Sequence, residues 1–372
     1  MAIASPSIKQ QRGSVIIVAL WTITLMTILV TVIASQNRLS AQVAYFHQQE
    51  LATWARVQEA VNRAEMELML ERMAPPVGIE EFNTLDESLE ELNRNELYRF
   101  NGDELTLHYP AAEDIVVRIY DHAGKINLRQ LSRGRLRMLL ETKLGGPDVA
   151  DPGQIDDLMD AWNDWQDLND GESPRGAEKD YYQSLSTPYV PRNGPLETVE
   201  ELLAIRGFAE VFGDVNLEAA FTVYGEDELV NLNVASIDTM RLLPGLNDEL
   251  IAAILEYRKE KDFQGNGDVA QLIPAENMAD LRQWLNSRKG DGYYTIMVYP
   301  RPQTAVTSAD ATDEADDDDV AAADSPLDPL LTAYSETVFV PTPRERPQVL
   351  KINPYQRLPV TALPPTDMAE AR

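Results

Sequence analysis

A long apolar stretch near the start of the chain limits what the sequence can fold into more than any other feature. No residue from Ser14 to Ser35 is charged, and a helix of that length would rise roughly 33 Å, which matches the hydrocarbon core of a bilayer. The leader ahead of it, residues 1–13, contains Lys9 and Arg12 but no acid. Because positive charge tends to stay in the cytoplasm, the sequence predicts one membrane-spanning helix with the bulk of the chain exported.

The helix is predicted to continue beyond the membrane. A cleaved secretory signal has an apolar core of only about 7 to 15 residues, so this run is too long for one. A plain signal anchor fits the length and the charge. However, residues 36–72 contain neither Gly nor Pro, and apolar side chains recur along them every three to five residues. These side chains are Leu39, Val43, Phe46, Leu51, Trp54, Val57, Val61, Ala64 and Leu68. The pattern predicts an amphipathic continuation over 36–74, in a helix roughly 88 Å long that packs within an assembly.

This N-terminal arrangement resembles that of type IV pilins and pseudopilins. The basic leader ends in Arg12-Gly13, and the uncharged helix begins directly at Ser14. The resemblance implies that a prepilin peptidase cuts between Gly13 and Ser14. Ser14 stands where Phe or Met is usual, and Val18 stands where most pilins carry a Glu. A carboxylate in lipid needs a partner, which in a pilin is the terminal amine of the preceding subunit. A subunit with Val18 therefore need not have another subunit ahead of it.

Further motifs, in the same order along the chain, resemble the K subunit of type II secretion systems. They are Asp121-x-x-Gly124-Lys125-Ile126-Asn127-Leu128, Asp164-Trp165-x-Asp167, Gly176-Ala177-Glu178, Tyr182, Pro188-Tyr189, Asn193, Glu201-Leu202, Arg206-Gly207 and Asn231-Leu232-Asn233-x-Ala235-Ser236. The resemblance implies a minor pseudopilin at the tip of the pseudopilus, which helps initiate its assembly for export of folded proteins across the outer membrane. It implies a single pass through the inner membrane, with a cytoplasmic N-terminus and a periplasmic bulk. Its expected partners are the minor pseudopilins I and J, other pseudopilus subunits and the prepilin peptidase, and no catalysis is expected.

The segments after the long helix predict a mixed α+β fold. Residues 75–131 and 291–353 contain strand-like patterns, whereas 132–290 has helical spacing. The predicted strands are Leu105 to Tyr109, Ile115 to Tyr120, Ile126 to Leu128, Tyr293 to Tyr299, Glu336 to Val340 and Gln348 to Ile352. The predicted helices include Arg133 to Leu144, Asp156 to Trp165, Thr198 to Ile205, Ile237 to Leu243 and Asp248 to Tyr257. Together with the resemblance, these patterns predict a pseudopilin fold: a long N-terminal helix, an antiparallel β-sheet, and a large α-helical domain inserted into it.

The composition of the chain excludes several kinds of site and of partner. The 372 residues contain no cysteine, which excludes disulfides and Cys-based metal or nucleophilic sites. The net charge of −29 argues against nucleic acid and anionic lipid as partners. Residues 301–333, which include four consecutive acids at 316–319, hold too little apolar area to order themselves and predict a disordered loop. Residues 354–372 are rich in proline and predict a flexible tail.

Two other functions compete with a structural one. Leu243-Pro244-Gly245-Leu246 resembles the turn of a helix-hairpin-helix, whose amides can hold a DNA phosphate, so a membrane-anchored DNA-uptake protein is the alternative. Phosphate binding needs a positive field, and this region is acidic, so the packing of two short helices is favoured and no nucleic acid is expected. An enzyme would need paired carboxylates together with a His or Ser. His122 lies in a predicted turn without a nearby nucleophile, so we expect it to be solvated and not catalytic.

An acidic helix end followed by an acidic loop favours a hard cation in the insert. Between residues 147 and 180 eleven acids face two basic residues. Asp156, Asp160 and Asp164 recur every four residues, so they share a helical face and repel one another. The loop 167–172 then offers closely spaced oxygen ligands in a turn that contains glycine, the ligand type that calcium prefers. Its spacing is not that of an EF-hand, and a solvated acidic loop explains these residues about as well.

The resemblance to K subunits, which hold calcium in this inserted domain, favours the metal site. Asp164, Asp167 and Glu178 match the motif positions of the family, while Asn169 replaces an acid that is common there. We therefore expect Asp167, Asp170 and Glu178 to bind calcium, with Asp164 and Asn169 assisting. The ion would order the loop and perform no chemistry.

Overall fold

The computed structural model describes residues 14–72, 99–286, 290–301, 332–342 and 345–358. The leader with Gly13, most of the acidic loop predicted at 301–333 and most of the tail predicted at 354–372 lie outside the described residues. Backbone contacts divide the chain into two compact units, residues 1–56 and residues 57–372.

Helix α1 runs without interruption from Ser14 to Arg72, which confirms the predicted helix and its continuation. It is the one helix of the described residues that is long and apolar enough to cross a membrane, with a window of mean hydropathy 2.6. Its threonine hydroxyls donate to backbone carbonyls of the preceding turn, so they add no unpaired polar group in apolar surroundings. These bonds join Thr22 to Ala19, Thr24 to Leu20, Thr27 to Ile23 and Thr31 to Thr27.

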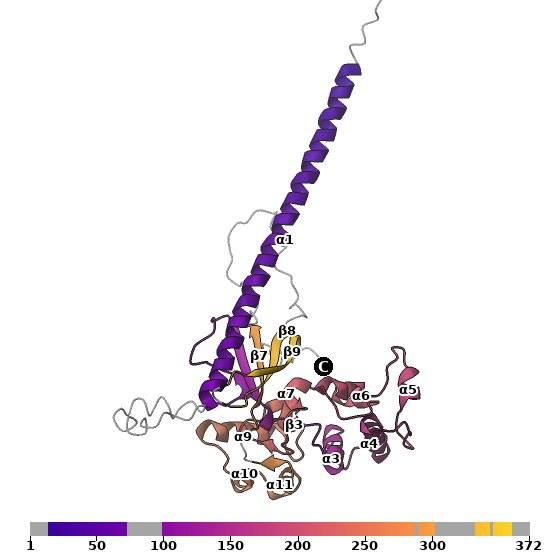
Figure 1. Ribbon diagram of the computed structural model, residues 1–372, viewed down its shortest axis with the longest axis vertical. Helices are drawn as coiled ribbons and strands as arrows, with labels where there is room; N and C mark the ends of the chain where they lie inside the picture. Colours follow the sequence, from indigo (N-terminus) through magenta and orange to yellow (C-terminus); the bar gives the residue numbers. More distant parts are fainter. Residues whose placement is uncertain (1–13, 73–98, 287–289, 302–331, 343–344, 359–372) are drawn as a thin grey trace, which may run out of the picture. The chain divides into compact units, whose positions relative to one another are not determined.

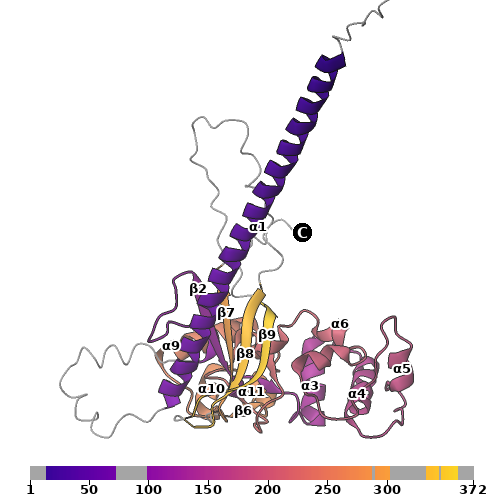
Figure 2. The same ribbon diagram turned by 45° about the horizontal axis from the view of Figure 1, so that its top comes forward.

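The second unit is organised around a five-stranded sheet with the order β1-β2-β7-β8-β9. The strands are β1 (Asn101–Glu104), β2 (Ile115–Asp121), β7 (Tyr293–Pro300), β8 (Thr332–Phe339) and β9 (Gln348–Arg357). Every neighbouring pair is antiparallel. The sheet thus combines strands from before and after the insert, which confirms the predicted fold class. Figures 1 and 2 show β7, β8 and β9 next to one another.

The last turns of α1 cover one face of this sheet. Val57, Val61, Ala64 and Leu68 recur every three or four residues and are at most 6% exposed. They share one hydrophobic core with alternate residues of the strands. The strand residues of this core include Ile115, Val117, Ile119, Tyr294, Ile296, Val298 and Val338.

The insert occupies the chain between β2 and β7 and supplies Ala219 to the core on the other face of the sheet. Its first half contains the 3-10 helix η2 (His122–Gly124), β3 (Ile126–Asn127), α3 (Arg133–Lys143), α4 (Pro152–Gln166), α5 (Lys179–Gln183), the 3-10 helix η3 (Val199–Ala204), α6 (Phe208–Phe212), α7 (Leu217–Ala220) and β4 (Phe221–Thr222). Its second half contains β5 (Val230–Asn231), α8 (Ile237–Met240), α9 (Asp248–Glu260), α10 (Asn266–Leu272), α11 (Ala275–Leu281) and β6 (Leu285–Asn286). In Figures 1 and 2, α3 to α6 form one group and α9 to α11 another, although one hydrophobic core runs from Ile126 to Leu285.

The first predicted strand is misplaced. It was expected at Leu105 to Tyr109, but β1 comes earlier, at Asn101–Glu104. The expected segment is held by α1 instead: Leu107 is buried, and the backbone N–H of His108 donates to the buried carboxylate of Glu67 at 2.9 Å. Only the start of the segment stays beside β2, where the Leu105 N–H donates to the Val117 carbonyl at 2.9 Å, while the buried Leu107 fills the core beside the helix.

Other boundaries differ because short segments find partners inside the insert. The extended segment predicted at Ile126 to Leu128 forms β3, which pairs in parallel with β4, and β5 pairs in parallel with β6. The helix predicted at Thr198 to Ile205 is the 3-10 helix η3, with the Thr198 N–H donating to Glu201 at 3.2 Å. Strand β9 extends to Arg357, so the start of the predicted tail at Pro354 is wrong.

Candidate functional site

Helix α4 carries the first of the predicted metal ligands into the interior. It starts with Asp151 as N-cap, whose carboxylate accepts from the Gly153 N–H at 3.0 Å, and Pro152 at its first position. Of the three acids predicted on one face, Asp156 and Asp160 are half-buried, and Asp164 is fully buried. Arg137 donates to Asp156 at 2.6 Å and lowers the pKa of that carboxyl. Of these three acids, Asp164 is therefore the one whose carboxylate needs hydrogen-bond partners inside the insert.

The loop after α4 folds back onto the Asp164 carboxylate. The Ser173 hydroxyl donates to Asp164 Oδ1 at 2.5 Å, and the Ser173 N–H donates to Oδ2 at 3.1 Å. Gly176 lies against the same group, and a Cβ at this position would meet Asp164 Oδ2 at 1.8 Å. Glycine is therefore required at 176 because any side chain would occupy the space of the carboxylate.

Glu178 is the least satisfied carboxylate of this region. Its side chain is 5% exposed, and both carboxylate oxygens are buried without a hydrogen-bond partner. Burial, followed by the negative charge of Asp164, raises the pKa of Glu178, and Asp167 and Asp170 add to the effect. The Lys179 N–H lowers this pKa less strongly and makes no hydrogen bond of normal geometry with either oxygen. An unpaired buried carboxylate is costly, so the position favours a cation.

Of the remaining predicted ligands, Asp167 is half-buried and Asn169 and Asp170 are exposed, and the side chains of all three accept hydrogen bonds. Asp167 Oδ1 accepts from the Asn169 N–H at 3.0 Å, and Asn169 Oδ1 accepts from the Gly171 N–H at 2.7 Å. Asp170 Oδ1 accepts from Asn193 Nδ2 at 3.1 Å. The other amide atom of Asn193, Oδ1, is buried without a partner. Asn193 also has φ of 50°, in the left-handed region that is uncommon for a non-glycine residue.

The predicted ligands thus divide into two groups. Asp164 and Glu178 lie in the interior, while Asp167, Asn169 and Asp170 lie outside it, although Asp167 and Asp170 are near enough to raise the pKa of Glu178. Within the described residues, no three His, Asp or Glu side chains are placed together to hold a metal ion. The unpaired oxygens of Glu178, the all-oxygen donor set and the glycine at 176 nevertheless fit a hard cation.

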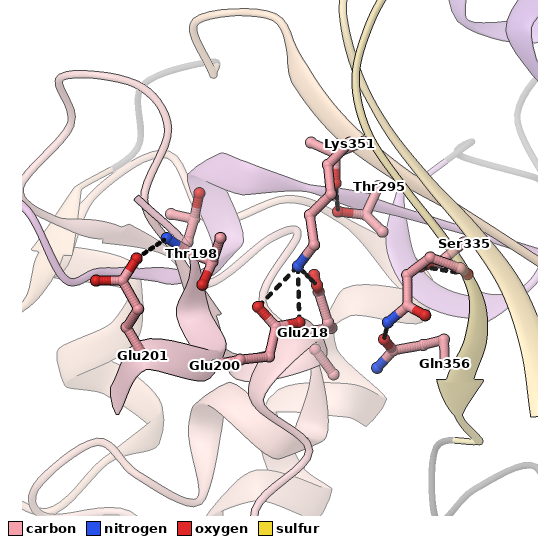
Figure 3. Close-up of polar contacts among 12 residues, drawn as sticks. Thr198, Glu200, Glu201, Glu218, Thr295, Ser335, Lys351 and Gln356 are labelled. Atoms are coloured by element: carbon pink, nitrogen blue, oxygen red, sulfur yellow. Dashed lines mark hydrogen bonds and ion pairs between the residues drawn. The ribbon is translucent and has the colours of Figure 1, made fainter. Parts of the chain in front are cut away.

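A second cluster of carboxylates lies between the insert and the sheet, and it has a cation of its own (Figure 3). Lys351 on β9 donates to Glu200 of η3 at 2.7 Å and forms an ion pair with Glu218 of α7. Glu218 is 7% exposed. Burial alone would lower the pKa of Lys351, but Glu218 and Glu200 outweigh burial and raise it. One ammonium therefore joins the edge strand of the sheet to two elements of the insert. We call Lys351, Glu200 and Glu218 together the Lys351 junction.

Next to this junction, His122 and Lys125 form a buried polar network. His122 Nδ1 lies 2.7 Å from the Thr222 hydroxyl and Nε2 lies 2.8 Å from the Thr295 hydroxyl, which also accepts from Lys125 Nζ at 2.9 Å. Burial, reinforced by Lys125, holds the pKa of His122 well below its ordinary value, and burial lowers the pKa of Lys125 to about 8. The expectation that His122 is solvated is wrong, because β4 and β7 close over the turn.

The match to a protein family lies within this insert. Residues 124–212 match the family model for protein K of the type II secretion system. We call these matched residues the protein K domain. The matched residues run from the end of η2 to α6 and contain all five predicted metal ligands.

Among the solved structures that are similar to this chain is a chain of the GspK-GspI-GspJ complex from the enterotoxigenic Escherichia coli type 2 secretion system, with 13% sequence identity and a TM-score of 0.42. The similarity covers 73% of this chain and 94% of that chain. No curated protein matches the chain at a significant level.

Beyond the protein K domain, the predicted helix-hairpin-helix turn is used for packing. Gly245 has φ of +78°, and a Cβ there would lie 2.4 Å from the backbone oxygen of Asn277. The Asn277 amide donates back to the Gly245 carbonyl at 2.8 Å. The following helix α9 starts with Asp248 and Glu249 in its first turn. These acids make the turn a poor site for a phosphate, in agreement with the packing interpretation.

Sequence analysis missed the Lys351 junction and the role of Asn193. Lys351 is the only charged residue between Gln348 and Asn353, and a lone lysine in an apolar strand could have indicated a buried pair. Its partners, Glu200 and Glu218, come from segments more than a hundred residues away. Asn193 belongs to the motifs quoted for the protein K resemblance, but nothing in the spacing indicated that it would contact the loop at Asp170.

Proposed function

We propose that this protein is a minor pseudopilin of a type II secretion system, located at the tip of the pseudopilus, where it helps initiate assembly for export of folded proteins. The match of residues 124–212 to protein K carries the proposal. It is supported by α1, whose N-terminal part is long and apolar enough to anchor the chain in a membrane. The rest of the same helix carries a stripe of apolar side chains that can pack against other subunits. The role is structural, and the proposal includes no catalytic step.

The anchor is proposed to lie in the inner membrane, with the N-terminus cytoplasmic and the second unit in the periplasm. Prepilin peptidase would cut between Gly13, which lies outside the described residues, and Ser14, the first residue of α1. Expression with the peptidase should give a mature protein that starts at Ser14, and Gly13→Leu should leave it uncut. An intact Met1 on the mature protein in a peptidase-positive cell would contradict the proposal.

The tip position follows from Val18 and from the size of the insert. Val18 provides no carboxylate for the amine of a subunit ahead, and in the isolated chain its side chain is 61% exposed. The insert would also clash with regular lateral packing. Overexpression of this protein alone should therefore give no fibres. Abundant fibres of this protein alone would refute the tip position and leave the family assignment intact.

The proposed partners are the minor pseudopilins I and J, as expected for a protein K. Coexpression of the full-length protein with I and J should allow all three to be purified together in detergent. The exposed residues of α1 before the second unit, such as Leu39, Phe46 and Trp54, should become protected from labelling in the complex. If I and J copurify with each other but never with this chain, the partner proposal fails.

Calcium is proposed as the ion of the protein K domain. Glu178 and Asp164 would hold it from the interior, while movement of the loop brings Asp167 and Asp170 to it, with Asn169 assisting. Asn193, which already contacts Asp170 and has a buried free oxygen, would fix the loop. The ion would compensate the charge of Glu178 and order the loop, and no reaction step involves it.

A further inference from the structure

Among the strands that the structure describes, β9 is the outermost of the five-stranded sheet and pairs with β8 alone, so one of its edges is open. Within the described residues, no backbone hydrogen bond joins that edge to another strand. β9 is ten residues long, whereas β1 at the opposite edge has four. A long unpaired edge offers a row of backbone N–H and C=O groups to an extended chain.

Four large apolar side chains of β9 are exposed. Val349 is 49% exposed, Leu350 41%, Ile352 55% and Tyr355 79%, so four large apolar groups lie within seven residues. Elsewhere in the second unit, the exposed large apolar residues are spread over separate segments. They are Met66, Leu70, Tyr109, Val149, Leu168 and Val190. An apolar group of this kind on one element is typical of a binding surface, whereas single exposed residues need no explanation.

Prolines limit the part of this edge that can pair. Pro347 precedes β9 and Pro354 lies within it. Because proline has no N–H to donate, pairing is interrupted at both positions. The usable stretch is Gln348 to Asn353, which we call the edge window. Lys351 is its only charged residue, and its ammonium is already paired with Glu200 and Glu218.

The surroundings of the edge window carry excess negative charge. On the α1 face of the sheet, Glu336 lies opposite Ile352 in register, and burial together with Glu336 raises the pKa of Glu65, against a smaller effect of Arg346. On the insert face, two carboxylates surround the single ammonium of Lys351. Among the described side chains, the four carboxylates of Glu65, Glu200, Glu218 and Glu336 outnumber the three cations Lys351, Arg346 and Lys125.

This charge decides between possible occupants. A second copy of the chain would bring the same local excess of carboxylates, and each chain carries −29 overall, so self-pairing is opposed by repulsion. A partner that is positively charged beside its strand is attracted to the same place. The apolar side chains of the window then need an apolar face on that strand.

We propose that the edge window of β9 binds an extended strand of another protein, about six residues long, apolar on one face and flanked by basic residues. Backbone hydrogen bonds continue the sheet, and alternate side chains of the incoming strand cover Val349 and Ile352. The Lys351 junction fixes β9 against the insert, so the edge is presented in one register. The inference stands on the geometry of β9 and does not depend on the proposed role in secretion.

The test uses a synthetic probe and the full-length protein in detergent at low ionic strength. The probe is the peptide Lys-Lys-Val-Thr-Val-Thr-Val-Thr-Lys-Lys, and amide exchange of β9 is followed by mass spectrometry. The probe should slow exchange in β9 by about tenfold or more and leave β1 unchanged. Two control peptides, one with glutamates in place of lysines and one N-methylated on alternate backbone nitrogens, should protect β9 weakly or not at all.

Three results would contradict the inference. Unchanged exchange of β9 with the lysine peptide, or equal protection by the N-methylated peptide, would overturn the inference. Protection of β9 that appears without peptide and rises with protein concentration would show that a second copy occupies the edge, which would also overturn it.

Variants locate the binding to the edge window. Ile352→Lys places a charge on the exposed edge and should weaken peptide binding about tenfold or more, because like charge then meets the flanking lysines. Val149→Lys changes an exposed valine outside any strand and should leave binding unchanged. Equal affinities of Ile352→Lys and the unchanged protein would place the peptide elsewhere and refute the assignment.

Discussion

The Glu178 region and the Lys351 junction both bury carboxylates in the insert, and they differ in where the compensating cation comes from. At the junction, Lys351 is in contact with Glu200 and Glu218. At Glu178, both oxygens are buried with no hydrogen-bond partner, and the charges that raise its pKa are those of other acids. Burying a carboxylate is tolerated when a cation is supplied. The first region has that cation within the chain, and at the second it would come from the proposed calcium ion.

The difference has a consequence for how each region responds to its surroundings. The junction should be insensitive to divalent cations, because its charges are already matched. The protein K domain should gain stability from calcium by mass action, since the folded chain provides the buried carboxylates and the unfolded chain does not. A substitution at the Lys351 junction should therefore lower the free energy of unfolding and leave the calcium response unchanged. A substitution beside Glu178 should change the calcium response as well.

The largest effect is expected from Gly176→Ala. The added Cβ would lie 1.8 Å from Asp164 Oδ2, so either the loop or the Asp164 side chain must move. We expect a loss of about 3 kcal/mol in the free energy of unfolding and loss of the calcium response. Chemical denaturation with and without calcium measures both. Gly134→Ala in α3 is the matched control: nothing lies within 4 Å of its new Cβ, so it should gain roughly 0.5–1 kcal/mol.

A smaller effect is expected at the junction. Lys351→Met removes the ammonium and leaves Glu200 and Glu218 without compensation. We expect a loss of about 2 kcal/mol, less than for a fully buried pair, because the Glu200 side chain is 47% exposed. The calcium response should remain. Lys259→Met breaks an ion pair whose side chains are more than 70% exposed and should change the free energy of unfolding by less than about 0.5 kcal/mol. Equal losses in the two variants would show that the junction contributes no more than a surface pair.

The smallest effect is a dependence on pH that comes from His122. Its pKa in the folded chain lies well below the ordinary 6.5, so the unfolded chain binds more protons as the pH falls through that value. Stability should therefore decrease on acidification, by about 1 kcal/mol between pH 6.5 and 5.5 from this residue. His122→Gln should remove that part of the slope in denaturation curves, and His47→Gln, at an exposed position, should preserve it. A slope unaffected by His122→Gln would contradict the burial of a neutral imidazole.

Much of the architecture could be predicted from the sequence because it rests on local patterns. The uncharged run and the absence of Gly and Pro up to Arg72 determine α1, and continuous apolar segments determine β2 and β7. The prediction failed where tertiary contacts override pattern. Residues 105–109 alternate like a strand but are used to cover α1, and η3 has a helical pattern but forms a 3-10 helix.

The residues of the candidate site were chosen from local patterns as well, and calcium binding there stays a prediction. Closely spaced oxygens between Asp164 and Glu178 indicated a cation, and the family motifs favoured calcium. The pattern could not show which oxygens are buried, because Glu178 enters the interior through a loop without periodicity. It also could not show the Lys351 junction, since a strand lysine and two distant glutamates meet only when the sheet and the insert are both formed.

Calcium titration of the full-length protein, made metal-free beforehand, tests the central comparison most directly. With calcium at about 100 times its dissociation constant, the unchanged protein should gain about 2.7 kcal/mol, or roughly 5–10 °C in melting temperature. Glu178→Gln should lose this gain and be more stable without calcium, because it removes an unpaired buried charge. Glu172→Gln, at an exposed position of the same loop, should respond like the unchanged protein. The same calcium response in Glu178→Gln as in the unchanged protein, or no response in either, would contradict the account.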